Sequence, residues 1–241
     1  MIDRFSIRER PSGQPVMHQK WGKLLFMHWP VDPTVLRPLI PSGLEIDTYD
    51  GKAWIAIVPF TMWDIRAFPP YMPGMPGLSA MHELNVRTYV HLNGTPGVWF
   101  FSLDCNSATA VFGARTFYYL PYYNADLGLE QSDSKIDYIL HRTDKPVATF
   151  KATWNIGALL PTAEPDSIEF FLTERYCLFA EHKGKLYRAR IHHRAWPLQT
   201  ATVDAWSSTM IDVLGVQEPT EPPLLHYAEQ IAVDIWMLEK M

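Results

Sequence analysis

The stretch ELNVRTYVHLNGTPGVWFFSLD, residues 83–104, decides the fold prediction for this chain of 241 residues. Two runs rich in β-branched and aromatic residues, 83–92 and 97–104, flank the pair Asn93-Gly94. An Asn-Gly pair between such runs is typical of a two-residue hairpin turn. We therefore expect an antiparallel hairpin here, with successive side chains on opposite faces of the sheet.

Similar runs, separated by turns that contain Pro or Gly, continue in both directions along the chain. Asp50-Gly51 predicts a second hairpin, between residues 44–49 and 53–60. Short helices are expected after the capping residues Asp32 and Ser107 and after the pair Asp166-Ser167. Further strands are expected at 23–29, 122–131, 135–142, 147–156, 176–181, 185–193, 200–206 and 227–238.

This pattern of short strands and turns predicts a mainly β protein. About ten strands do not form one open, flat sheet, so the sheet should curl, close or split. We therefore expect an antiparallel β-barrel with a few short peripheral helices. No linker, charge block or internal repeat divides the chain, which predicts a single domain over residues 1–241.

Composition and charge exclude several classes of protein. Hydrophobic residues make up 47% of the chain and charged residues 20%, as in a folded globular protein. The net charge of -5 argues against general affinity for nucleic acid or for an anionic membrane. The N-terminus lacks the pattern of a signal peptide, and no apolar run approaches the ~18–20 residues that span a bilayer. We expect a cytoplasmic protein with free thiols.

The sequence contains none of the motifs that commonly hold a cofactor or a metal ion. It has no phosphate loop, no dinucleotide fingerprint and no Gly-Xaa-Ser-Xaa-Gly elbow. His192 and His193 are adjacent in a predicted strand, so their side chains should point to opposite faces. Cys105 and Cys177 are too few for a Cys-rich metal site. We therefore predict no cofactor and no metal.

Polar residues alternate along the first strand of the hairpin. Glu83, Asn85 and Arg87 should share one face, opposite an apolar face. That polar face is either solvated, with charge pairs across strands, or it lines an interior where Arg87 offers its guanidinium to a carboxylate or phosphate. An unpaired buried charge is costly, so Glu83 or Asp104 should lie within salt-bridge distance of Arg87.

Four further residues are candidates for the same pocket. Asp104 should share a face with Phe100, and it either caps a helix or takes part in chemistry. Arg115 lies late in a predicted helix, where a cation favours the helix dipole, and it is close in sequence to Tyr122 and Tyr123. Arg115, Tyr122 and Tyr123 are therefore candidates for the pocket, with a purely structural role as the alternative.

Several segments together carry a family resemblance. They are LFMHWPV (25–31), LRPLIPSGLE (36–45), the two hairpin strands, FLTERYC (171–177) and Ile191-His192-His193. Their order and spacing resemble the YqjF-like family of unknown function over nearly the whole chain. That family is grouped by fold with acetoacetate decarboxylase, so the resemblance implies an acetoacetate decarboxylase-like β-barrel with a buried cavity.

The chemistry of acetoacetate decarboxylase does not transfer to this chain residue by residue. That enzyme forms a Schiff base on a Lys with a second Lys beside it. Aligning Gly113-Ala114-Arg115 with the corresponding stretch places these lysines near Tyr122 and Tyr123, and Tyr forms no imine with a ketone. Lys151, in a predicted strand, should face solvent.

The resemblance and the polar strand together predict a cavity that binds a small, anionic organic molecule. If the protein is an enzyme, we expect lyase- or decarboxylase-like acid/base chemistry. The alternatives are a non-catalytic binding or sensing module and an enzyme that forms an imine on Lys151. The Pro-rich segment Phe68 to Ala80 is expected to form either the cavity rim or an inert surface loop. The oligomeric state is left open, a homo-oligomer included.

Overall fold

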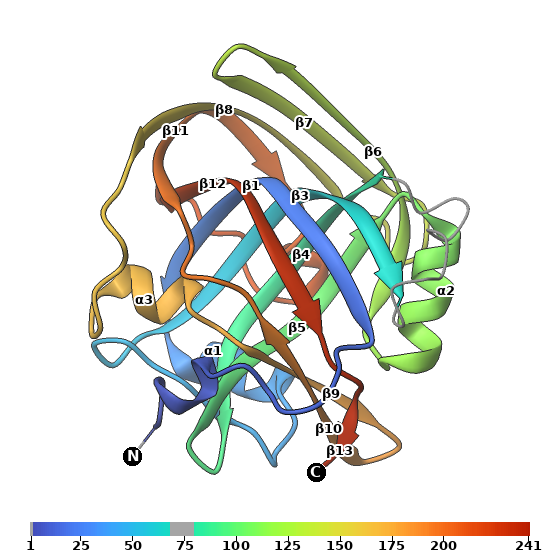
Figure 1. Ribbon diagram of the computed structural model, residues 1–241. Helices are drawn as coiled ribbons and strands as arrows, with labels where there is room; N and C mark the ends of the chain where they lie inside the picture. Colours follow the sequence, from blue (N-terminus) through green and yellow to red (C-terminus); the bar gives the residue numbers. More distant parts are fainter. Residues whose placement is uncertain (1, 68–79) are drawn as a thin grey trace.

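The computed structural model describes residues 2–67 and 80–241, and it shows a mainly β protein (Figure 1). All strands belong to one 13-stranded sheet, which confirms the predicted fold class. The segment expected to form a cavity rim, Phe68 to Ala80, lies outside the described residues except for Ala80. The strands are β1 (Met17–Val31), β2 (Glu45–Ile46), β3 (Ala53–Ala67), β4 (Ala80–Leu92), β5 (Thr95–Cys105), β6 (Tyr122–Ser132), β7 (Lys135–Arg142), β8 (Thr149–Leu159), β9 (Cys177–His182), β10 (Lys185–His192), β11 (Leu198–Ser208), β12 (Leu224–Ile235) and β13 (Glu239–Lys240).

The helices are short and begin where the sequence places capping residues. Asp32, Ser107 and Ser167 each accept a hydrogen bond from a backbone N–H of the first turn, which satisfies one otherwise unpaired donor. In the described residues no helix is both long and apolar enough to cross a membrane. The helices are α1 (Pro33–Leu36), α2 (Ala108–Phe117) and α3 (Ile168–Thr173), with 3-10 turns at η1 (Ser6–Arg8), η2 (Arg37–Leu39) and η3 (Asp212–Leu214).

The hairpin turns follow the sequence with one exception. Asn93 and Gly94 both have positive φ, at 50° and 84°, which matches the twist of the flanking strands β4 and β5. Asp50 and Gly51 also form a tight turn, but it closes only the single bridge Tyr49–Lys52. The expected hairpin between 44–49 and 53–60 is wrong, because β2 pairs with β4 instead of β3.

The sheet closes on itself and branches, so that it forms two fused rings. The larger ring follows β5, β6, β7, β8, β11, β12, β1, β3 and β4 back to β5. The smaller ring leaves β5 through β9 and β10 and returns to β12. Most pairings are antiparallel, as expected, but β5 pairs in parallel with β6 and with β9. The five strands β12, β1, β3, β4 and β5 belong to both rings.

The shared strands have two buried faces, and the two faces have different surroundings. Leu25, Ile57 and Leu84 point into the larger ring, where they pack with Trp154 and other large side chains in the main core. Phe26, Val58 and other residues of the opposite parity point into the smaller ring. The larger ring is filled by its own side chains, whereas the smaller ring encloses a cavity.

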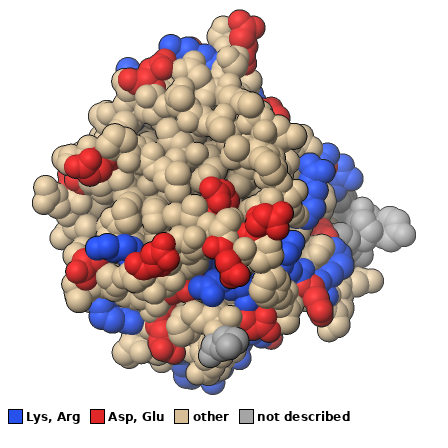
Figure 2. Space-filling view, turned by 90° about the vertical axis from the view of Figure 1, so that its left-hand side faces the viewer, with Lys and Arg blue, Asp and Glu red and all other residues tan. Residues whose placement is uncertain are grey.

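Charge is well mixed on the part of the surface that Figure 2 shows. Lys and Arg side chains lie among Asp and Glu side chains over the lower half of that face, and much of its upper part carries neither.

Candidate ligand cavity

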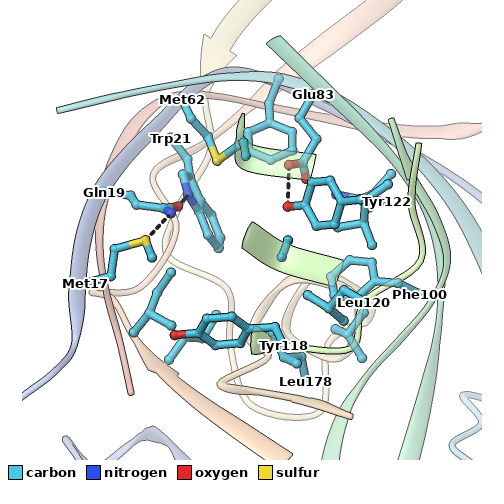
Figure 3. Close-up of a pocket in the computed structure, with 18 of the residues that line it drawn as sticks. Met17, Gln19, Trp21, Met62, Glu83, Phe100, Tyr118, Leu120, Tyr122 and Leu178 are labelled. Carbon is cyan, nitrogen blue, oxygen red and sulfur yellow. Dashed lines mark hydrogen bonds between the residues drawn. The ribbon is translucent and has the colours of Figure 1, made fainter. Parts of the chain in front are cut away.

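The smaller ring encloses a cavity of about 360 Å³, bounded by the shared strands, by β9 and β10, and by one face of α2. Most of the side chains that line it are apolar, among them Leu24, Val58, Phe60, Met62 and Phe100. Polar side chains enter from a few positions only. Figure 3 shows Glu83 and Tyr122 on one wall, with Met17, Gln19 and Trp21 on the wall opposite. A mostly apolar cavity with a few convergent polar groups is typical of a small-molecule site.

Glu83 on β4 points into this cavity and is only 2% exposed. The Tyr122 hydroxyl donates a hydrogen bond of 2.7 Å to its Oε2 atom (Figure 3). No Lys, Arg or His lies within salt-bridge distance of Glu83 among the described residues, and residues 68–79 contain no charged side chain. Burial away from water raises the pKa of Glu83 to about 8, so the carboxyl group carries its proton at neutral pH.

Tyr122 reaches Glu83 because β6 lies beside β5, with Tyr122 paired to Leu103. Burial, followed by the nearby Glu83, raises the pKa of Tyr122 well above its ordinary value, and the phenol stays a hydrogen-bond donor. When the Tyr122 hydroxyl donates to one carboxyl oxygen, the proton of Glu83 is free for a ligand. The pair can therefore give a proton to a bound molecule and take one back.

Arg87 also lines the cavity, four residues along β4 from Glu83. Its guanidinium carbon lies 5.3 Å from the ring centre of Phe26 and 5.7 Å from that of Tyr89. Its buried Nε has no hydrogen-bond partner in the described structure. The expectation that Glu83 or Asp104 pairs with Arg87 is wrong. Glu83 and Arg87 are four residues apart along β4, so their backbones lie about 13 Å from each other. Asp104 forms its ion pair with Arg142 instead.

Arg175, which follows α3, is a cavity residue that the sequence analysis did not select. It is 5% exposed, donates from Nη1 to Asp47 over 2.6 Å and donates from Nε to the Phe171 carbonyl over 2.7 Å. Its Nη2 is buried without a partner in the described structure. The only available signal was the charged pair Glu174-Arg175 directly after an apolar helix, within a segment that already carried the family resemblance.

Asp104 is buried but is not among the residues that line the cavity. It accepts two hydrogen bonds from Arg142, at 2.6 Å from Nε and 2.8 Å from Nη2. Across the β4–β5 ladder, Val86 lies opposite Ser102 whereas Arg87 lies opposite Phe100, so one extra residue is inserted in β5. This β-bulge shifts the alternation by one residue and turns Asp104 to the face opposite Phe100.

Two other candidates are held on the outside of the cavity. Arg115 is partly exposed and donates to the Tyr122 carbonyl at 2.7 Å and to Asp144 at 2.8 Å. Tyr123 lies next to Tyr122 on β6 and therefore points to the other face of that strand, where its ring centre is 4.1 Å from the Arg142 guanidinium carbon. Neither side chain lines the cavity, whereas Glu83, Asn85, Arg87 and Tyr122 do.

No lysine side chain faces the cavity in the described structure. All nine lysines lie in the described part of the chain, and none of them lines it. Lys151 is exposed on β8, as expected. Cys177 does line the cavity, but burial raises its pKa to about 12 and keeps it a thiol. Residues 2–67 and 80–241 hold no group of three or more His, Cys, Asp or Glu that could bind a metal ion.

Comparison with known proteins agrees with the fold. Residues 18–232 match DUF2071, a family described as uncharacterized conserved protein. The chain is 46% identical over 242 residues to the uncharacterized protein YqjF of Bacillus subtilis (strain 168), a match that covers 100% of this chain and 99% of that protein.

Solved structures share the fold at much lower identity. The enduracididine biosynthesis enzyme MppR in complex with pyruvate has a TM-score of 0.67 at 11% identity, over 95% of this chain and 91% of that one. An acetoacetate decarboxylase has a TM-score of 0.63 at 15% identity, over 98% and 91% of the two chains. An acetoacetate decarboxylase-like enzyme from Sphingomonas wittichii RW1 also has a TM-score of 0.63, at 12% identity over 95% and 94%. At these identities the likeness shows the fold alone.

Proposed function

The chain belongs to the DUF2071 family of uncharacterised proteins, and we propose that it binds a small acidic organic molecule in the cavity of its smaller ring. The fold supports a small-molecule role, since two structures of the similar enzyme MppR are described with pyruvate and with a condensation product of pyruvate. The proposal itself rests on this chain's own cavity residues.

The observation that carries the proposal is that Glu83 and Arg87 share one cavity without pairing with each other. A buried acid and a buried arginine that served stability alone would form an ion pair, because an isolated buried charge is expensive. Here β4 holds the two side chains apart, and the Arg87 Nε has no acceptor in the described structure. A carboxylate from outside the chain would supply that acceptor, with two oxygens that match the planar guanidinium.

Glu83 and Tyr122 supply acid/base chemistry to a ligand held in this way. With its carboxylate at Arg87, the ligand would extend along β4 toward the protonated Glu83. A carboxyl group whose pKa lies near the working pH can both donate and accept a proton efficiently. The exclusion of all nine lysines from the cavity favours this chemistry over imine formation.

A non-catalytic binding or sensing module is the second candidate. The observation that favours it is the apolar character of most of the cavity wall, where Leu24, Val58 and Phe60 offer surface but no reactive group. The two candidates share the Arg87 contact and differ in the need for Glu83. Consumption of a bound acid by the wild type, lost in Glu83→Gln with binding retained, would support the enzyme. Binding without consumption would support the sensor.

Thermal-shift measurements with a panel of small carboxylic acids and their neutral amides test the proposal. A ligand present at 100 times its dissociation constant adds about 2.7 kcal/mol to the stability of the folded state. We expect acids to stabilise the wild type and the control Arg194→Gln, which removes an exposed arginine, but not Arg87→Gln. Equal stabilisation by the amides, or full stabilisation of Arg87→Gln, would contradict an anion site at Arg87.

A further inference from the structure

One end of the cavity holds two arginines with incomplete hydrogen bonding. The guanidinium carbons of Arg87 and Arg175 lie 5.7 Å and 4.7 Å from the ring centre of Tyr89, and both residues line the cavity. Arg87 Nε and Arg175 Nη2 are buried without partners in the described structure. Asp47 is the one carboxylate paired with either of them among the described residues, and it also pairs with Arg4.

This end of the cavity therefore carries an excess of positive charge. His28, which forms a hydrogen bond of 2.6 Å with the Tyr89 hydroxyl, does not add to it. Burial, and then the charge of Arg87, lower the pKa of His28 well below its ordinary value and keep the ring neutral. A single carboxylate can accept hydrogen bonds from two guanidinium groups at once, one at each oxygen.

At the α2 end, the cavity is kept open by a glycine. Gly113 lies inside α2 and lines the cavity, and a Cβ atom built there would meet nothing within 4 Å. Glycine inside a helix costs roughly 0.5–1 kcal/mol relative to alanine, and no close packing here requires it. The missing side chain leaves space at this end of the cavity.

Apolar side chains connect the two ends. Leu24, Val58, Phe60 and Leu103 line the cavity together with Ala110 of α2. The row Arg87, Asn85, Glu83 runs along β4 toward the strand end nearest α2, since Glu83 pairs with Cys105 and α2 begins at Ala108. A short acid at the arginines would leave most of this apolar wall without contact.

We propose, on the basis of the function proposed above, that the ligand is a carboxylic acid with an extended apolar body. Its carboxylate is held between Arg87 and Arg175, and its body follows the apolar wall to the space beside Gly113. The cavity volume of about 360 Å³ is compatible with such a molecule, because pockets for drug-sized ligands begin at roughly 300 Å³.

Calorimetric titration with straight-chain saturated carboxylates, from acetate to dodecanoate below their micelle-forming concentrations, tests this inference. Burial of each methylene contributes ≈ 0.8 kcal/mol, so affinity should rise about fourfold per methylene until the chain reaches α2, and then fall. Primary alcohols of equal length should bind at least about tenfold more weakly, because the arginines have no carboxylate to bind.

Two variants locate the ends of the ligand. Arg87→Gln should weaken binding of all chain lengths by a similar factor. Gly113→Leu should move the optimum to shorter acids without lowering the melting temperature, because leucine favours the helix and the space is open. Ala110→Leu, one turn earlier on α2 and also facing the cavity, gives the same readout if Gly113→Leu does not fold.

The outcomes separate this inference from the proposed function. If acetate or another short acid binds as tightly as the long acids, and Gly113→Leu leaves the length profile unchanged, the apolar-bodied ligand is excluded while the anion site stands. If alcohols bind as well as acids, or no acid of any length binds, both proposals fail.

Discussion

This protein has two sets of buried acids and arginines, whose acids lie on the neighbouring strands β4 and β5 but whose surroundings differ. In the larger ring, Asp104 on β5 and Arg142 on β7 form a two-bonded ion pair, with both side chains at most 1% exposed. In the smaller ring, Glu83 and Arg87 on β4 line a cavity and neither has a charged partner among the described residues. Leu84 pairs with Asp104, so the two acids are one residue apart across the ladder.

The comparison shows how one sheet separates structural charges from charges available to a ligand. The strands shared by the two rings present alternate side chains to a filled core and to a cavity. A charge that enters the filled core must bring its partner, because no water or ligand can reach it. A charge that faces the cavity can instead be paired by a ligand that enters from outside.

The largest expected effect comes from breaking the structural pair. Arg142→Gln leaves the Asp104 carboxylate buried without its cation, which should lower the free energy of unfolding by about 3–5 kcal/mol. Urea unfolding followed by tryptophan fluorescence measures this change. In a double-mutant cycle, Asp104→Asn combined with Arg142→Gln should cost less than the sum of the single variants. A loss below about 1 kcal/mol for Arg142→Gln would remove the contrast between the two rings.

Glu83→Gln should instead stabilise the protein at alkaline pH. The folded state holds the Glu83 proton up to a pKa of about 8, against 4.5 for the ordinary group. The contribution of Glu83 to stability is therefore fully present below pH 4.5 and is lost as the pH rises to 8. The difference between the two pKa values corresponds to a loss of about 5 kcal/mol in the free energy of unfolding above pH 8. The glutamine variant avoids this loss, but its new amide N–H must find a hydrogen-bond acceptor. We therefore expect the variant to be more stable than the wild type by about 2–4 kcal/mol at pH 9.

Unfolding at pH 4.5, 7 and 9 measures this effect against the wild type. The groups that influence the pKa of Glu83 include Tyr122, Asp104 and Asn85, and all three are unchanged in the variant. Identical pH profiles for Glu83→Gln and the wild type between pH 4.5 and 8 would show that the carboxyl group titrates normally.

Arg87→Gln should change stability far less than Arg142→Gln. Arg87 has no carboxylate partner among the described residues, so its removal orphans no buried charge. We expect a change of no more than about 1 kcal/mol, because the lost contacts with Phe26 and Tyr89 are offset by relief of an unpaired buried charge. Calorimetric melting alongside Arg142→Gln gives a direct comparison. A loss of 3–5 kcal/mol would assign Arg87 to the fold, as for a paired buried arginine.

The smallest effect is expected at Lys151, which belongs to neither charged set. It is exposed on β8, so Lys151→Ala should alter stability by no more than about 0.5 kcal/mol. Wild-type protein treated with acetoacetate and borohydride should keep its intact mass, because no lysine lines the cavity. A mass gain that maps to Lys151 would restore imine chemistry as a candidate.

Much of the local structure was predictable from the sequence. The Asn93-Gly94 turn, the caps at Asp32 and Ser107 and most strands follow from local preferences, which depend on a few adjacent residues. The assignment of Glu83, Asn85 and Arg87 to one face also follows, because alternation needs only an unbroken strand. The strand and turn pattern predicted a closed, mainly antiparallel sheet, and the family resemblance narrowed this to the acetoacetate decarboxylase-like fold.

Only the tertiary structure decided the partners of the charged residues. The bulge in β5 turns Asp104 away from the cavity and toward Arg142, and no local signal marks it. Arg175 reaches the cavity because Asp47, 128 positions away in the chain, holds it there. Side-chain direction follows from alternation between neighbouring residues, and the sequence determined it in β4, where the strand is unbroken, but not across the bulge in β5. Pairing between distant residues depends on how the sheet branches and closes, which only the assembled rings determine.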